Sequence, residues 1–149
     1  MKKLLCVWGS ANYGKTSSII EFDKILNQNY SNQIIQVSSV GTYKDDIQRI
    51  YKIGKVTVGI ESQGDPNSRQ KSSLSLFGKN NCDIIICASR SRGNTVANVD
   101  NFCKRNGYDC FWISTLYSPK LHNQYGLQIN QRSGESIYNI FNDFMSGKY

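Results

Sequence analysis

Two glycines, a lysine and a threonine near the N-terminus have the residue types and the spacing of a phosphate-binding site. They stand in the order Gly9-Ser-Ala-Asn-Tyr-Gly14-Lys15-Thr16 and fit the pattern GxxxxGK[ST] at every fixed position. Glycine at both ends allows the backbone to turn tightly without a Cβ clash. Backbone N–H groups then surround the phosphates, Lys15 reaches the β- and γ-phosphates, and the Thr16 hydroxyl is a ligand of Mg²⁺. The sequence therefore predicts a site for a triphosphate and magnesium.

The segments around this motif provide the context that such a loop requires. An apolar strand over residues 4–8 leads into it, and a helix over residues 15–29, with apolar residues spaced by three and four, leads out of it. Residues 9–16 resemble the Walker A motif of the P-loop nucleoside triphosphatases, a superfamily that includes kinases, GTPases and ATPases. The resemblance implies that the nucleotide is bound by Gly9, Asn12, Tyr13, Gly14, Lys15, Thr16 and Ser17. The Tyr13 side chain either covers the ribose or packs on the loop.

A site of this kind also needs a carboxylate at the end of a neighbouring strand, where it holds Mg²⁺ through water. Glu61, at the end of the strand-like segment 56–61, is the first candidate, with Gly64 as the glycine whose N–H contacts the γ-phosphate. The spacing Glu61-x-x-Gly64 is similar to the Asp-x-x-Gly of the GTPase switch, with glutamate in place of aspartate. Alternatively, Asp65 supplies the metal ligand or the base from the following loop. Three further acids remain candidates, namely Asp45, Asp46 and Asp83.

Two arginines follow the most apolar strand-like segment, residues 83–88, at the edge of the sheet where open α/β folds bind ligands. Arg90 and Arg92 are suited to contact phosphate or an acidic substrate, or to neutralise charge in a transition state. A solvated basic turn is the alternative. GTPases carry Asn-Lys-x-Asp at the equivalent place to read guanine, and this tetrad is absent from the chain. ATP is therefore the expected nucleotide. The single histidine, His122, is expected at the surface.

The composition excludes several other classes of protein. A chain of 149 residues predicts one domain, residues 1–149, and a charge of +7 is compatible with an acidic or nucleic-acid partner. No apolar run approaches the roughly 20 residues that span a bilayer, and the apolar residues 4–8 are too few for a signal peptide. We therefore expect a cytoplasmic protein with no membrane partner. Five cysteines without a CxxC pair predict neither a disulfide framework nor a zinc site.

Apolar strand-like segments alternate with helical ones, which is typical of an α/β layer fold. Strands are expected over residues 4–8, 34–38, 46–53, 56–61, 83–88 and 109–114, with a hairpin around Gly54-Lys55. Helices are expected over residues 15–29, 73–79, 95–106 and 133–145, and irregular segments over 62–73 and 118–130. The predicted fold is a three-layer P-loop fold. It has a mostly parallel five-stranded sheet, an antiparallel hairpin strand, and helices on both faces.

Three functions are compatible with these features. The first is Mg²⁺-dependent hydrolysis of ATP, or a nucleotide-dependent switch, in which the loop 62–73 responds to the γ-phosphate and Gln63 or Asp65 orients water. The second is a small kinase that transfers the γ-phosphate to a small molecule or a nucleic acid. The third is a basic module that binds nucleic acid. The first function is favoured, because 149 residues leave little chain for the lid of a nucleotide kinase.

Overall fold

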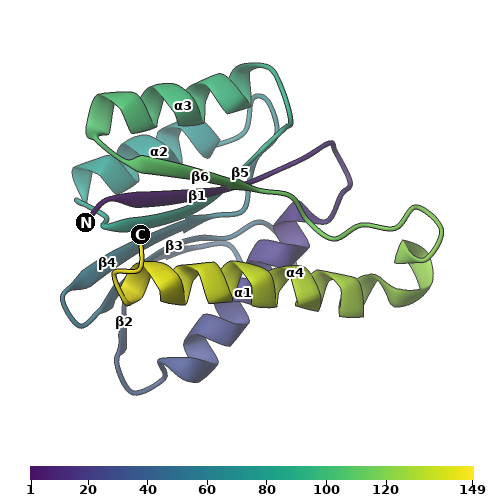
Figure 1. The fold of residues 1–149 in the computed structure, drawn as a ribbon, viewed down its shortest axis with the longest axis horizontal. Coiled ribbons are helices and arrows are strands. Elements are labelled where there is room, and N and C mark those ends of the chain that lie inside the picture. Colours follow the sequence, from purple (N-terminus) through teal and green to yellow (C-terminus); the bar gives the residue numbers. More distant parts are fainter.

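The computed structural model describes residues 1–149 as one six-stranded sheet between two layers of helices (Figure 1). The strands are β1 (Lys3–Trp8), β2 (Ile34–Val40), β3 (Gln48–Ile53), β4 (Val56–Glu61), β5 (Ile84–Ser89) and β6 (Asp109–Ile113). Their order in the sheet is β2-β3-β4-β5-β1-β6. Strands β4, β5, β1 and β6 are parallel, and β3 is antiparallel to both of its neighbours. All six strand segments expected from the sequence pair into this one sheet, which therefore has six strands rather than the predicted five.

Each face of the sheet is covered by two helices. These are α1 (Lys15–Asn29), α2 (Gln70–Lys79), α3 (Asn94–Asn106) and α4 (His122–Met145). Figure 1 shows α2 and α3 on one face and α1 and α4 on the other. Along β1, Leu5 and Val7 pack towards α1 and α4, whereas Leu4 and Cys6 belong to the core beneath α2 and α3. This alternation follows from the two-residue period of a strand, so the central strands must be apolar on both faces.

The hairpin predicted around Gly54 is confirmed, with β3 and β4 paired in antiparallel register from Gln48–Glu61 to Ile53–Val56. Its tight turn places Gly54 at φ +61°, a conformation that favours glycine. This pairing has a consequence for function. Because β3 is antiparallel to β4, the start of β3 lies at the same edge of the sheet as the ends of β4, β5 and β1.

The prediction of an irregular segment over residues 118–130 holds for residues 118–121 and is wrong from His122 onwards, where α4 begins, with one non-helical residue at Tyr125. Leu121, Tyr125 and Leu127 are exposed, and the first buried residue of α4 is Ser133. The first turns of α4 therefore carry no apolar face towards the core, and the periodic pattern that predicts a helix is missing there. Helix α2 also begins earlier than expected, at Gln70 rather than residue 73.

Helices α1 and α4 approach closely at Gly134. A Cβ atom on this glycine would lie 2.7 Å from Glu21 Cβ and 2.9 Å from the Phe22 nitrogen. We expect Gly134→Ala to lower the free energy of unfolding by about 1–3 kcal/mol, because the helices must move apart. Chemical denaturation measures this change. Gly126→Ala in the same helix is the control, since its nearest neighbour there would be at an ordinary 3.5 Å; equal losses in the two variants would contradict the packing argument.

A buried carboxylate on α1 makes the stability depend on pH. Asp23 is 0% exposed, and its Oδ2 accepts a hydrogen bond of 2.7 Å from the Tyr43 hydroxyl, whereas Oδ1 has no partner. Burial raises the pKa of Asp23, and the hydrogen bond from Tyr43 opposes this effect only in part. A raised pKa in the folded state means that the proton stabilises the fold. The stabilisation is complete below the ordinary pKa of 3.8 and is lost as the pH rises through the raised value.

Asp23→Asn should therefore raise the melting temperature by a few degrees at neutral pH, because the amide needs no proton to be neutral and still accepts from Tyr43. The difference from the wild-type protein should shrink as the pH is lowered towards 4. Thermal melts at a series of pH values measure this. Asp45→Asn, at an exposed position, should show no such trend. A constant difference across the series would mean that the Asp23 charge is not its cause.

Candidate functional site

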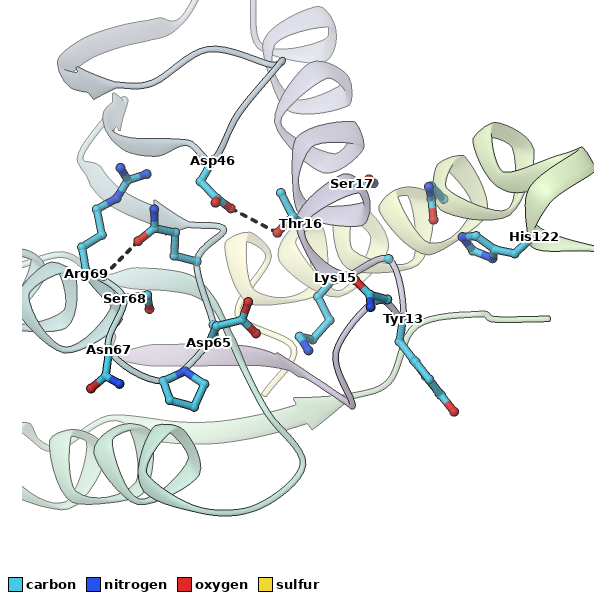
Figure 2. Close-up of a pocket in the computed structure, with 16 residues that line it drawn as sticks. Tyr13, Lys15, Thr16, Ser17, Asp46, Asp65, Asn67, Ser68, Arg69 and His122 are labelled. Atoms are coloured by element: carbon cyan, nitrogen blue, oxygen red, sulfur yellow. Dashed lines mark hydrogen bonds between the residues drawn. The ribbon is translucent and has the colours of Figure 1, made fainter. Parts of the chain in front are cut away.

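A polar cavity of about 710 Å³ lies at the edge of the sheet where the parallel strands end (Figure 2). One wall is the loop of residues 9–14, here called the glycine loop, together with the start of α1. The opposite wall is the connection from β4 to α2, residues 62–69. The lining residues are Asn12, Tyr13, Gly14, Lys15, Thr16, Ser17, Asp46, Gln63, Gly64, Asp65, Pro66, Asn67, Ser68, Arg69, His122 and Asn130. Ligands of open α/β sheets bind at this edge.

The glycine loop is held in a curved conformation. Gly14 has φ +77° and Asn12 has φ +63°, both in the left-handed region, and the Gly9 N–H donates to the Ser89 carbonyl at the end of β5. No side chain caps the N-terminus of α1, although the Ser18 N–H and hydroxyl both bond to the Gly14 carbonyl. The first N–H groups of a helix have no partner within it. Those of α1 are therefore directed at the cavity without competition from a cap, as an anion site requires.

Lys15 folds back over the glycine loop. Its Nζ donates to the carbonyls of Gly9 at 2.6 Å and Ser10 at 2.9 Å, and the residue is only 7% exposed. Burial lowers the pKa of Lys15, while the negative charge of Asp65 acts in the opposite direction. Figure 2 shows the Lys15 and Asp65 side chains on opposite sides of the cavity. The ammonium group is thus held at the concave side of the loop, where an anion would neutralise it.

The Thr16 hydroxyl forms a hydrogen bond with Asp46 and not with Glu61 or Asp65, the two acids that the sequence favours. Its hydroxyl lies 3.1 Å from Asp46 Oδ1 and 3.2 Å from the Ser62 carbonyl oxygen. The Ser62 hydroxyl donates to the same Asp46 oxygen at 2.9 Å and accepts from the Ile47 N–H at 2.8 Å. Asp46 precedes β3, which runs antiparallel, so the predicted hairpin already implied that this acid lies beside residues 61–63. The hairpin is therefore a sequence signal that favours Asp46, although its contact with Thr16 also depends on the order of the strands.

Glu61 is fully buried and its carboxylate is occupied by protein donors. Oε1 accepts from the Gln63 N–H at 2.8 Å, and Oε2 accepts from Arg69 Nε at 2.8 Å and from the Ser73 hydroxyl. Glu61 does not line the cavity. Glu61 therefore holds the start of α2 against the end of β4.

Asp65 lies at the cavity and is paired with one of the two arginines. Arg90 Nε is 2.7 Å from Asp65 Oδ1, and the two side chains are 35% and 64% exposed. Arg92 and Asp45 are both exposed, and neither lines the cavity. Asp83 precedes β5, and its carboxylate accepts a hydrogen bond from the Thr57 N–H.

Gly64 allows the loop 62–69 to lie directly against β5. A Cβ atom on this glycine would be 2.7 Å from the Ala88 carbonyl carbon and from the Ser89 nitrogen. No side chain fits at this position unless the backbone moves. The Gly64 backbone is therefore held at the cavity wall by the close approach of two main chains.

Residues of α4 close the cavity at the end away from Asp65 (Figure 2). His122 was expected at the surface, but it is half-buried and lines the cavity together with Asn130, which sequence reasoning missed. His122 Nδ1 and Asn130 Oδ1 are buried without a hydrogen-bond partner. Tyr13 stacks on Tyr117 with ring centroids 4.0 Å apart, and Figure 2 shows its side chain directed away from Asp46. Packing of Tyr13 against the segment after β6 accounts for its position.

The chain offers no ready-made metal cluster. No group of three or more His, Cys, Asp or Glu side chains is arranged to hold an ion, and all five cysteines are free thiols. None of the helices has the length and apolar character needed to cross a bilayer. The comparisons with family models, with curated proteins and with solved structures found no significant match to this chain.

Proposed function

We propose that the protein binds ATP with Mg²⁺ and that the glycine loop holds the phosphates. The observation that carries this proposal is the convergence on one cavity of the Lys15 ammonium, the uncapped N-terminus of α1 and the Thr16–Asp46 pair. The first two of these groups bind anions and the third suits a cation, so together they match a magnesium triphosphate. The volume of about 710 Å³ is within the range of small-molecule sites.

Mg²⁺ is assigned to Thr16 and Asp46. Magnesium keeps several waters and is bound by one or two carboxylates together with substrate phosphates, so a preformed cluster of protein ligands is not required. The Thr16 hydroxyl and the Asp46 carboxylate, which now bond to one another, would hold the ion, Asp46 through a water molecule. The ion would supply neutralisation of charge between the β- and γ-phosphates. Glu61 is not assigned to the metal, because its carboxylate already accepts three hydrogen bonds from the protein.

Hydrolysis is the reaction that the loop 62–69 fits best. Asp65 faces Lys15 across the cavity, where it would orient a water molecule towards the γ-phosphorus. A water oxygen bonds to phosphorus as the bond to the bridging oxygen breaks, which leaves ADP and inorganic phosphate, and the proton passes to solvent. Arg90 positions Asp65 through their ion pair. Such a partly exposed pair contributes little to stability, so the loop can rearrange when the γ-phosphate arrives or leaves, as in a switch.

A kinase is the second candidate, and the composition of the cavity wall favours it. Asn67 and Ser68 line the cavity beside Asp65 and provide polar groups that would hold an acceptor hydroxyl. In this reaction Asp65 would accept the proton of the acceptor instead of orienting water.

Incubation of the purified protein with γ-labelled ATP and MgCl₂ tests both reactions. We expect label in inorganic phosphate, at a rate that depends on Mg²⁺ and is absent when EDTA is added. Label in an added acceptor rather than in phosphate would favour the kinase. If the protein neither binds nor turns over ATP, GTP or inorganic triphosphate, the assignment of the cavity to a nucleotide is wrong.

A further inference from the structure

A second cavity, of about 530 Å³, lies between α2 and α3 on the opposite layer from α1 and α4. Figure 1 shows the two helices side by side over one face of the sheet. Three of the ten lining residues are cationic, namely Lys71, Lys79 and Arg105, and none is acidic. The three cationic residues are exposed, and none of them forms an ion pair within the protein. This groove therefore carries a net positive charge that the fold does not use.

Most of the other groups that line the groove are uncharged donors and acceptors. Asn98 and Asn101 of α3 face it, and Phe102 forms part of its surface. Phe102 packs over Gly78, where an added Cβ would lie 3.2 Å from the ring. The nearest acid of α3, Asp100, is bound to Lys104 at 2.6 Å and does not line the groove. A groove with cations, amides and one aromatic ring suits a ligand that carries phosphate and flat bases.

The cations are spread along the groove, which suits a ligand that carries several phosphates. Lys71 and Lys79 are eight residues apart on α2, which corresponds to about 12 Å along the helix axis. Arg105 lies across the groove on α3. A strand with a charge every ~3.4 Å or more can follow the groove from one lysine to the other, so that each cation contacts a phosphate of its own.

We propose that the α2–α3 groove binds the phosphate backbone of a single-stranded nucleic acid. Lys71, Lys79 and Arg105 each neutralise a phosphate, and the asparagine amides and the Phe102 ring contact sugars or bases without reading a defined sequence. The site is separate from the ATP cavity and shares none of its lining residues. The two sites meet at the start of α2. Arg69, directly before this helix, lines the ATP cavity, and Lys71, the second residue of the helix, lines the groove.

The test is fluorescence anisotropy of a labelled oligothymidylate, measured over a range of salt concentrations. Three phosphate contacts to a single strand predict a slope of log K against log salt of about −2, or about 20-fold weaker binding at 200 mM than at 50 mM salt. The triple variant Lys71→Ala, Lys79→Ala, Arg105→Ala should bind at least about tenfold more weakly and lose most of this slope. Its ATP turnover should equal that of the wild-type protein, since none of the three lines the ATP cavity.

The matched control removes the same charge elsewhere. Lys44, Lys52 and Lys55 are exposed, form no ion pair and do not line the groove. Their triple alanine variant should bind the oligonucleotide as the wild-type protein does. An equal loss in both triple variants would overturn the site, because binding would then depend on net charge alone. Displacement of the oligonucleotide by polyglutamate at the same charge concentration would overturn the nucleic-acid assignment, and so would the absence of oligonucleotide binding.

Discussion

We expect Lys15→Ala to bind ATP about 10- to 100-fold more weakly than the wild-type protein, because hydrogen bonds from a charged donor contribute about 1.5–3 kcal/mol. Turnover should fall further, by about 10²–10³-fold, since the ammonium is directed at the place where charge develops during phosphoryl transfer. The residue is held there in advance by the Gly9 and Ser10 carbonyls. Titration calorimetry and phosphate release measure the two effects separately.

Two controls make this result specific. Lys52→Ala removes one exposed lysine from β3 and should leave ATP binding unchanged. A melting curve of Lys15→Ala must show that the fold persists without the bonds across the glycine loop. If the folded variant binds ATP as tightly as the wild-type protein does, the phosphates do not occupy this loop.

The second large effect is expected at Asp46. Asp46→Asn should raise the Mg²⁺ concentration needed for half-maximal turnover by about 10–100-fold, the usual cost of losing a group that orients the ligands of a metal ion. The amide can still accept the hydrogen bonds that Thr16 and Ser62 give to the carboxylate, so the fold should be retained. A magnesium titration of phosphate release at saturating ATP measures the change.

Glu61→Gln is the informative comparison, because the sequence favours this acid for the metal. We expect the variant to lower the melting temperature while the magnesium requirement stays as in the wild-type protein, since Glu61 is buried and ion-paired with Arg69. If the variant instead has a normal melting temperature and its turnover no longer depends on Mg²⁺, Glu61 rather than Asp46 holds the metal. Asp65→Asn should reduce turnover and leave the magnesium requirement unchanged.

The alternation of apolar strand-like segments with helical ones was sufficient to predict most of the fold. Residues 84–89 form a strand that is apolar on both faces, and such a run fits only the centre of a sheet covered by two layers of helices. Gly54 marked the hairpin, because a two-residue turn needs a residue that tolerates positive φ. The start of α4 could not be predicted, since its first turns pack little apolar surface and carry no helical period.

The sequence by itself determined the glycine loop and the helix that follows it, because the residues involved are neighbours in the chain and their conformations are local. Only the tertiary structure decided which acid meets Thr16, which arginine pairs with Asp65, and that His122 and Asn130 close the cavity. Asp65 and Arg90 are 25 residues apart in the chain, and Thr16 and Asp46 are 30 apart. Their proximity depends on strand order and direction, and above all on the antiparallel β3, which returns Asp46 to the edge where the parallel strands end.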